Sequence, residues 1–283
     1  MAHSESTDLD VPAHLSSLLN AVQEAAYVAK RQFDEGRFDF KEKSPGDWVS
    51  SCDSKVESIL KKSLLTICPS AGFWGEEGGV VTSPGCKLGK EPCDKSLMWV
   101  VDPIDGTANF IRGIPHFSSV VALIDNDGKP LFGAIIDPCR NESFWAIKGL
   151  GAYLGDQPLK RVIDRHPLEC LFAFVSPKPS SNLAPKLSQW LSTSINMFGG
   201  VRRSGSMALD LAWIAAGRMD AFAGFNLDPW DILAGELLIT QVGGFVNKEA
   251  LHQGSGPNIQ RFAASTSAQA FELIRSIDNL VDC

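Results

Sequence analysis

Two aspartates stand close together at the end of an apolar run. Residues 97–110 read LMWVVDPIDGTANF, so Asp102 and Asp105 follow Trp and Val side chains that are typical of a buried strand. Carboxylates this close repel each other, and burial increases the cost, unless a proton or a cation lies between them. The pattern therefore predicts a site that binds positive charge.

Acidic residues also occupy three other places where the chain leaves an apolar or turn segment. They are Asp53, the pair Glu76–Glu77 and Asp231. Hard divalent cations prefer oxygen ligands, and Mg²⁺ usually also binds substrate phosphate. Thr107 adds a hydroxyl group that can hold a water molecule beside the ions. If the four acidic groups converge, they form a magnesium site.

Each acidic group also has a purely structural interpretation. Glu76–Glu77 can be a solvated turn, and the aspartates of the DPID segment can cap the amides that follow them. Asp53 and Asp231 can each cap a helix. Taken singly, these interpretations are at least as good as metal binding. Taken together, the order and surroundings of the four groups favour a metal site.

The elements that would position these acids begin with two helices. Apolar residues at helical spacing predict a helix from near Pro12 that ends before Gly36, and a second helix that follows Asp53. Strand patterns then occupy residues 97–101, 118–124, 131–136 and 143–147. The first half is therefore expected to pack helices on a mostly antiparallel sheet.

The second half alternates between strands and helices. We expect strands at 171–175, 219–225 and 245–246, and helices at 184–191, 206–216, 231–242 and 268–281. This alternation predicts a second sheet covered by helices. The expected organisation is a disordered tail (1–11), an N-terminal α+β lobe with most of the metal ligands (12–155), and a C-terminal α/β lobe that completes the site (156–283).

Composition excludes several classes of protein. With 44% hydrophobic and 21% charged residues the chain is typical of a globular protein, and no apolar run reaches the roughly 20 residues that cross a bilayer. The net charge of -7 argues against binding a nucleic-acid polymer through a basic surface. No secretory signal is evident, so a cytoplasmic location is expected. The cysteines include no CxxC pair, which favours free thiols, although Cys86 and Cys93 share a loop.

Five motifs resemble the inositol monophosphatase family, within the lithium-sensitive, Mg²⁺-dependent phosphatases. In order they are WGEEGG, WVVDPIDGTANF, GIPHF, RRSGSMALDLAWIAAGRMDAF and LDPWDILAGELLITQVGG. The resemblance runs from about Leu15 to about Ala264. It implies an α/β fold, namely an αβαβα sandwich of the inositol monophosphatase and fructose-1,6-bisphosphatase type. It also implies a homodimer, inhibition by Li⁺ and about two to three Mg²⁺ ions per subunit.

By the same resemblance, the acids have separate roles in metal binding. Glu76, Asp102 and the main-chain carbonyl of Ile104 would hold a first ion. Asp102, Asp105 and Asp231 would hold a second ion. Glu76 with waters would hold a third ion more weakly.

The resemblance also assigns catalytic and substrate contacts. Thr107 and Asp53 would form a hydrogen-bonded pair, and Thr107 with Glu76 would orient the attacking water. Lys43 matches a lysine loop that approaches the outer metal in relatives, with a solvated lysine as the alternative. The implied substrate contacts are Asp105, Gly106, Thr107, Gly205, Ser206 and Asp231, with the amides of Gly106 and Thr107 receiving phosphate oxygens.

The substrate implied by the resemblance is a small phosphorylated polyol, with inositol monophosphate first. Relatives that hydrolyse inositol phosphates commonly carry a glutamate seven positions before the PWD aspartate, where this chain has Gly224, and Asn226 or Asp228 are candidate substitutes. Histidinol phosphate, fructose 1,6-bisphosphate and a nucleotide 3'-phosphate are alternative substrates. A catalytically idle regulatory member of the family is the alternative from another functional class. The segments expected to select the substrate are 174–182, 202–208 and 224–228.

Overall fold

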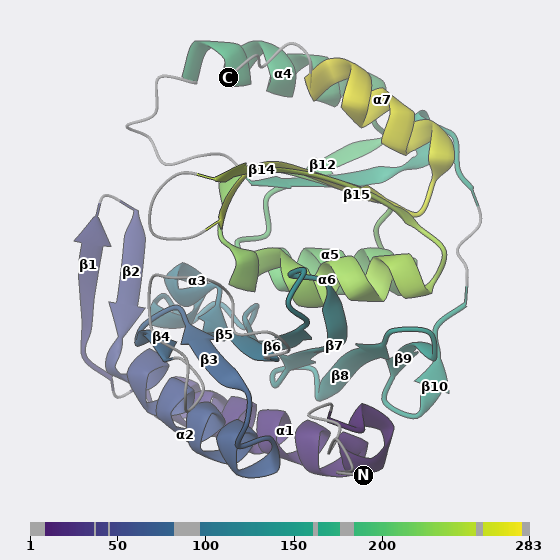
Figure 1. Cartoon of the computed structure of the whole chain (residues 1–283). Helices are drawn as coiled ribbons and strands as arrows, with labels where there is room; N and C mark the ends of the chain where they lie inside the picture. Colours follow the sequence, from purple (N-terminus) through teal and green to yellow (C-terminus); the bar gives the residue numbers. More distant parts are fainter. Residues whose placement is uncertain are drawn as a thin grey trace, which may run out of the picture.

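Five layers of secondary structure alternate through the molecule: helices, a sheet, helices, a second sheet and helices (Figure 1). This order, seen in a computed structural model, confirms the predicted αβαβα sandwich. The structure describes residues 9–36, 38–44, 46–81, 97–160, 164–175, 184–252 and 257–278. The expectations for residues 1–8, for Cys86 and Cys93, and for 176–182 lie outside these ranges.

The first two layers are a helix pair and an eight-stranded sheet. Helices α1 (Val11–Glu35) and α2 (Ser51–Ile67) cover one face of the sheet, whose strand order is β10-β9-β8-β7-β6-β5-β3-β4. Its strands are β3 (Gly72–Gly75), β4 (Gly79–Val81), β5 (Met98–Asp105), β6 (Ser118–Ile124), β7 (Pro130–Asp137), β8 (Glu142–Ile147), β9 (Gly151–Leu154) and β10 (Gln157–Pro158). All its pairings are antiparallel except that of β3 with β5, as the sequence predicts for a mostly antiparallel sheet.

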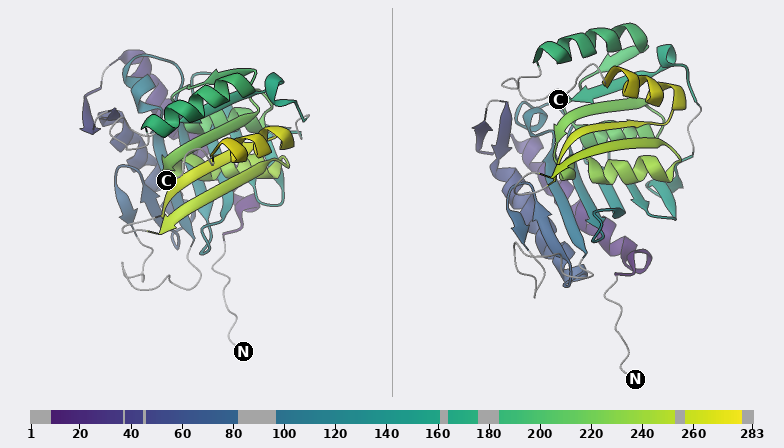
Figure 2. Two further views of the ribbon diagram at one scale, coloured as in Figure 1. Left: turned by 90° about the horizontal axis from the view of Figure 1, so that it is seen from above. Right: turned by 45° about the horizontal axis from the view of Figure 1, so that its top comes forward.

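The remaining layers come from the second half of the chain. Helices α5 (Met207–Ala215) and α6 (Pro229–Gln241) lie between the two sheets, and α4 (Ala184–Met197) and α7 (Ala268–Asp278) cover the outer face of the second sheet (Figure 2). The second sheet has the order β12-β11-β13-β15-β14. Its strands are β11 (Leu171–Val175), β12 (Gly200–Arg202), β13 (Ala221–Leu227), β14 (Phe245–His252) and β15 (Pro257–Ser265), and η1 (Pro167–Glu169) precedes β11.

Two short elements complete the first half. The hairpin of β1 (Phe40–Ser44) and β2 (Asp47–Ser50) stands beside the large sheet, and α3 (Thr107–Ile111) follows β5 after one residue (Figure 1). The two predicted lobes share a core, because α6 packs on strands of the first sheet. The lobe boundary near residue 155 therefore stays a prediction, and β10 still pairs with β9 just beyond it.

The second helix begins earlier than the sequence predicts. It starts at Ser51, not after Asp53, because Ser50 and Asp53 form a capping box. The amide of Ser50 donates to Asp53 Oδ2 at 2.9 Å, and the hydroxyl of Ser50 donates to the same oxygen at 2.6 Å. Asp53 therefore lies inside the first turn, at the third helical position.

The second sheet is also longer and wider at one edge than the sequence predicts. The expected strand at 245–246 is the start of β14, which pairs along its length with β15, a strand that the sequence reasoning missed. Polar residues 247–249 interrupt the apolar pattern, because an edge strand is paired on one side and partly exposed. The sequence indicates only a short apolar segment before Glu76, where the structure has the β3–β4 hairpin.

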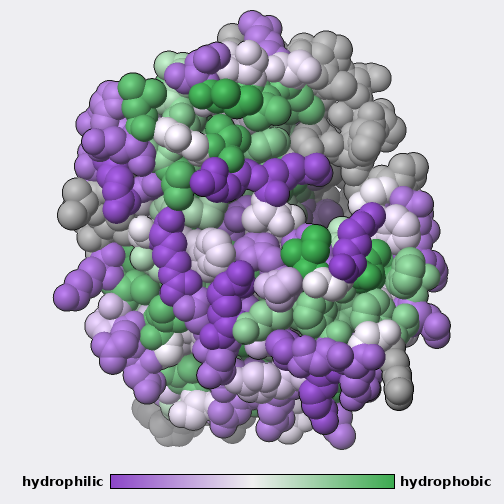
Figure 3. All heavy atoms as spheres, turned by 180° about the vertical axis from the view of Figure 1, so that it is seen from behind, coloured by the Kyte–Doolittle hydropathy of each residue, from purple (hydrophilic) through white to green (hydrophobic). Residues whose placement is uncertain are grey.

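Helix α6 is buried on most of its sides because it lies between two sheets, and its polar residues Glu236 and Thr240 share the remaining side. Its buried residues include Ile232, Leu233, Ala234, Leu237 and Leu238. The surface seen from behind mixes hydrophilic residues with small hydrophobic patches (Figure 3). Within the part of the chain that the structure describes, no helix combines the length and apolar character needed to cross a membrane.

The close approach of α6 to the first sheet predicts a large effect from one methyl group. A Cβ atom at Gly133 of β7 would lie 2.9 Å from the Cα atom of Ala234. Because the neighbour is main chain, Gly133→Ala should lower the free energy of unfolding by about 1–3 kcal/mol. Urea denaturation measures this, with the exposed Lys129→Ala as the control. An unchanged midpoint for Gly133→Ala would contradict this packing.

Candidate active site

Residues from six separate segments line one cavity of about 380 Å³, and one of these residues is Val175 at the end of β11. The others come from the β1–β2 hairpin, the end of β3, the end of β5, the turn before α5, and the segment from β13 into α6. The predicted site residues among them are Glu76, Asp102, Ile104, Asp105, Gly106, Thr107, Gly205 and Asp231. The structure thus brings together nearly all residues that the sequence singles out.

The pairing of β3 with β5 places Glu76 beside Asp102. The two strands are parallel, with Gly75 opposite Val101, and the amide of Glu76 donates to the carbonyl of Val101 at 3.1 Å. Parallel strands end at the same edge of a sheet. Glu76, which follows Gly75, and Asp102, which follows Val101, therefore lie side by side.

The DPID segment is a bulge held by its own hydrogen bonds. The register with β6 shifts between Asp102 and Asp105, and the amide of Ile104 donates to Asp102 Oδ1 at 3.0 Å. Gly106 then takes φ +93°, where a Cβ would also lie 3.1 Å from the carbonyl oxygen of Gly205. The bulge turns both aspartates toward the second half of the chain.

Thr107 and Asp53 lie within hydrogen-bonding distance. The hydroxyl of Thr107 is 3.1 Å from Asp53 Oδ1 and 2.9 Å from the carbonyl oxygen of Ile104, so it can donate to either. Burial raises the pKa of Asp53 to about 6, although hydrogen bonds from Ser50 lower it. Asp53 does not line the cavity but reaches it through Thr107.

Asp105 is bound at the start of α5. Its carboxylate accepts hydrogen bonds from the hydroxyl of Ser206, from the amide of Met207 at 3.2 Å and from the amide of Ala208 at 2.9 Å. The sequence predicts that Ser206 contacts substrate. In the structure the side chain of Ser206 is fully buried and donates to Asp105. This contact joins the end of β5 to the start of α5.

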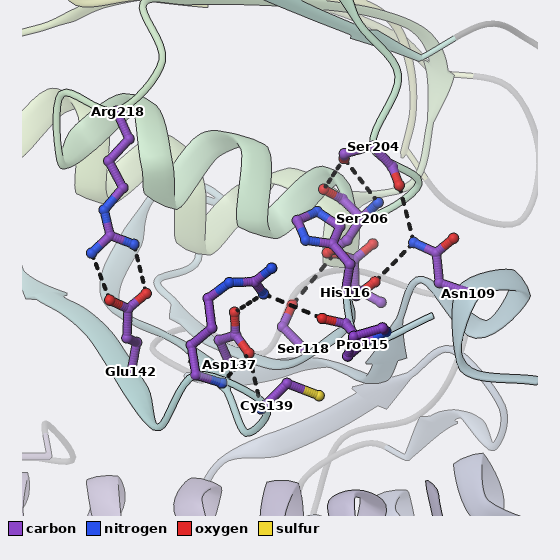
Figure 4. A network of polar contacts seen from close by, with 12 residues as sticks. Asn109, Pro115, His116, Ser118, Asp137, Cys139, Glu142, Ser204, Ser206 and Arg218 are labelled. Atoms are coloured by element: carbon purple, nitrogen blue, oxygen red, sulfur yellow. Dashed lines mark hydrogen bonds and ion pairs between the residues drawn. The ribbon is translucent and has the colours of Figure 1, made fainter. Parts of the chain in front are cut away.

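Asn109 fixes the loop that carries Ser206, and the sequence reasoning missed it. Its side-chain amide donates to the carbonyl oxygen of Ser204 at 3.0 Å and to that of His116 at 2.8 Å (Figure 4). Asn109 lies in the DGTANF motif, but nothing in its spacing indicates a partner 95 residues away. His116 contacts this network through its main chain and is not among the residues that line the cavity.

Asp231 has the same place in α6 as Asp53 has in α2. It is the third helical residue of a capping box, and its Oδ2 accepts from the amide of Asp228 at 2.9 Å. The structural role that the sequence left open for both acids is therefore present. Capping occupies one carboxylate oxygen of Asp231 and leaves the other oxygen outside these bonds.

Negative charge accumulates around the cavity. Burial raises the pKa of Asp102 well above its usual value, and repulsion from Glu76, Asp105 and Asp231 raises it further. Burial likewise raises the pKa of Asp231, against the hydrogen bond from Asp228. Such a group of carboxylates is stabilised by protons or by a bound cation.

Lys43 supplies the nearest positive charge. Its Nζ lies 3.2 Å from Glu76 Oε1 and 2.5 Å from Glu77 Oε1. Although burial lowers the pKa of Lys43, the two glutamates raise it above its usual value. The β1–β2 hairpin thus brings the ammonium group of Lys43 to the outer rim of the site, as its resemblance to the lysine loop of relatives implies.

The donor set fits Mg²⁺ in its chemistry. All candidate ligands are carboxylate or carbonyl oxygens, which this ion prefers. Across the residues that the structure describes, no three Asp, Glu, His or Cys side chains are arranged to hold a metal as they stand. The reason is local: Asp105 is turned to the amides of α5, and Glu76 contacts Lys43.

Comparison with known proteins decides the family. The model of the inositol monophosphatase family matches residues 13–280. The chain belongs to the inositol monophosphatase family. Family membership accounts for the αβαβα order and for the motifs at β3, β5 and α6.

Relatives in this family carry two kinds of name. The chain is 38% identical over 232 residues to an inositol-1-monophosphatase of Caulobacter vibrioides, covering 80% of this chain and 86% of the relative. It is also 38% identical over 207 residues to the Nus factor SuhB of Xylella fastidiosa, covering 72% and 70%. The solved structure of extragenic suppressor protein suhB from Bartonella henselae matches with a TM-score of 0.80 and 30% identity, covering 95% of this chain and 98% of that one.

The raised pKa values predict how the metal-free protein responds to pH. Because Asp102 and Asp231 have pKa values above the ordinary 3.8 when folded, the folded state binds more protons than the unfolded state between the two values. The free energy of unfolding should therefore fall as pH rises from about 4 through the raised values. Asp102→Asn removes one repelling charge and should raise the Tm in EDTA at pH 7.5 by about 2 °C or more.

Calorimetry in EDTA from pH 5 to pH 8 measures both effects. Asp127→Asn, on the exposed turn between β6 and β7, is the control and should follow the unsubstituted chain. A Tm for Asp102→Asn at or below that of the control at pH 7.5 would contradict the inferred repulsion.

Proposed function

We propose that the chain is a Mg²⁺-dependent phosphomonoesterase that hydrolyses a small phosphorylated polyol, with inositol monophosphate as the first candidate. One observation carries the proposal: Glu76, Asp102, Asp105 and Asp231, from distant segments, line the same cavity as Thr107. Burying this much negative charge is costly unless a cation is bound. A phosphate ester beside bound Mg²⁺ is a natural occupant of such a cavity.

The residues of the chain have separable tasks in this reaction. Mg²⁺ would lower the pKa of the attacking water and neutralise charge on the phosphate group. Glu76, Asp102, Asp231 and the carbonyl oxygen of Ile104 would bind the ions. The hydroxyl of Thr107, which donates to Asp53, would accept from the attacking water and orient it.

Asp105 completes the proposed site in a second way. In the structure it fixes the start of α5 through Ser206 and two amides. Rotation of one carboxylate oxygen toward the cavity would let it serve the second ion while α5 keeps the other. The amides of Gly106 and Thr107, on the loop between β5 and α3, would donate to phosphate oxygens.

The polyol part of the substrate is the least determined. A Cβ at Gly224 would lie 2.7 Å from Leu227 Cδ1, so Leu227 occupies the space beside the position where relatives carry a glutamate. Asn226 and Asp228 line the same cavity and supply polar groups in its place. Histidinol phosphate, fructose 1,6-bisphosphate and a nucleotide 3'-phosphate are the alternatives. We further propose a cytoplasmic homodimer with about two to three ions per subunit and inhibition by Li⁺.

A second candidate function is regulatory, through binding and without catalysis. It is favoured by a relative named Nus factor SuhB, which has the same 38% identity to this chain as the relative named inositol-1-monophosphatase, although over a shorter length. A protein that has lost catalysis has no need of the acids or of Thr107. All of them are present in this chain, which supports the enzyme.

Asp102→Asn tests the enzyme directly. Phosphate release from inositol 1-phosphate should require Mg²⁺, and the substitution should lower kcat by at least about 100-fold because it removes a ligand of both principal ions. Circular dichroism checks that the fold is kept. A variant that keeps full activity would refute the ligand assignment, and an unsubstituted chain without Mg²⁺-dependent phosphate release on any ester tested would favour the regulatory function.

Thr107→Val separates water orientation from metal binding. The substitution keeps the shape but removes the hydroxyl that contacts Asp53, so kcat should fall by about 100-fold, with little change in the Mg²⁺ concentration for half-maximal activity. Steady-state kinetics over a Mg²⁺ series measure both quantities. Thr66→Val, at an exposed position near the end of α2, is the matched control. Equal kcat values in the two variants would exclude a catalytic role for the Thr107 hydroxyl.

A further inference from the structure

Glu57 is a buried carboxylate that the proposed reaction does not use. It lies on α2 one turn after Asp53, so the two side chains share one face of the helix. Only 6% of Glu57 is exposed. Its Oε2 accepts a hydrogen bond from the amide of Glu77 at 2.8 Å. Helix α2 therefore contacts the site twice, at Thr107 through Asp53 and at the β3–β4 turn through Glu57.

The turn between β3 and β4 fits closely around this carboxylate. A Cβ at Gly78 would lie 2.5 Å from Glu57 Oε1, and a Cβ at Gly75 would lie 2.5 Å from Glu57 Cδ. Neither glycine has a positive φ, so what excludes a side chain at these positions is the space taken by Glu57. Burial raises the pKa of Glu57, while the amides of Glu77 and Gly78 lower it. The glycines of the WGEEGG motif thus let the main chain close on the carboxylate.

Glu76 stands between two fixed points of the main chain. Its own amide donates to the carbonyl of Val101 on β5 at 3.1 Å, and the next amide, that of Glu77, donates to Glu57 on α2. The peptide units on both sides of the Glu76 Cα atom are therefore held, one by the sheet and one by the helix. Lys43 contacts the side chains of Glu76 and Glu77 but not their main chain.

We propose that Glu57 is a positioning residue for metal binding: its carboxylate fixes the Glu77 amide and so directs Glu76 toward Asp102. The inference rests on the proposed function, because it assigns Glu57 a task in the same site. A charged acceptor holds an amide more strongly than a neutral acceptor does. Glu57 itself binds neither metal nor substrate.

The first test measures Mg²⁺ affinity without relying on turnover. In Glu57→Ala, the Kd for Mg²⁺, obtained by fitting the rise in Tm across a Mg²⁺ series, should increase by about 10- to 100-fold, as when a residue that orients a metal ligand is lost. Glu57→Gln keeps an acceptor oxygen and should lie between. Ser58→Ala, at the next and exposed position of α2, should match the unsubstituted chain.

Kinetics then separate positioning from general damage. At saturating Mg²⁺, kcat and the KM for inositol 1-phosphate in Glu57→Ala should return to within about 3-fold of the unsubstituted values, because excess metal compensates for a weakened site. A residue that only supports the fold would lower the metal-free Tm and leave the Mg²⁺ concentration for half-saturation unchanged.

The glycine cradle provides a double-mutant test. Gly78→Ala alone should displace the Glu57 carboxylate and weaken Mg²⁺ binding about as much as Glu57→Ala does. In Glu57→Ala/Gly78→Ala the added methyl group meets no carboxylate, so the double variant should resemble Glu57→Ala. Such non-additivity is expected for residues that contact each other and not for distant, independent sites.

The outcomes distinguish this inference from the proposed function. If the unsubstituted chain shows neither Mg²⁺-induced stabilisation nor Mg²⁺-dependent phosphate release, the proposed function fails, and the inference fails with it. If the unsubstituted chain responds to Mg²⁺ and Glu57→Ala responds at the same concentrations, the inference alone is overturned. Additive effects of Glu57→Ala and Gly78→Ala on Mg²⁺ affinity would also overturn it.

Discussion

Repulsion among buried carboxylates is the constraint on which the rest of the site depends. Asp102 and Asp231 are buried, and each faces other acids across the same cavity. Uncompensated, this charge would favour a more open structure. The fold resists opening because Asp102 and Asp231 each also accept a hydrogen bond from a main-chain amide. Hydrogen bonds therefore hold the site together, and its negative charge favours the binding of a cation.

Helix N-termini supply much of the compensation. Asp53 is at the third position of α2, Asp231 is at the third position of α6, and Asp105 accepts from the first amides of α5. The positive end of each helix dipole and its unpaired amides stabilise a carboxylate. Capping and metal binding are thus not competing interpretations of these residues. Asp231 shows this most clearly, because one of its oxygens caps α6 and the other lies outside the capping bonds.

Local patterns made the layers and most of the site predictable from the sequence. The strand at 118–124 follows from a continuous apolar run and the end of the first helix follows from a glycine stop, and both are as predicted. Two motifs, DPIDGT and PWD, indicated the acids because they are short and chemically unusual. Most of the edge strand β14 and the whole of its neighbour β15 were not recognised because their burial depends on neighbours far along the chain. The partnership of Ser206 with Asp105 joins residues 101 positions apart, and no local pattern records it.

Glu57 is a second residue whose partners no local pattern in the sequence indicates. Its side chain occupies an ordinary helical position, and only the folded structure shows that two glycines of a hairpin twenty residues later surround it. The proposed metal ligands are constrained by charge, so their residue types are nearly fixed by the chemistry. The residues that orient them are constrained by distance and shape, which depend on how α2 packs against β3 and β5. Leu227 fills the space beside Gly224 and lines the cavity, but it is not among the proposed ligands of the ions. Its side chain can therefore differ with the substrate while the acids, the capped helices and the glycine cradle stay as they are.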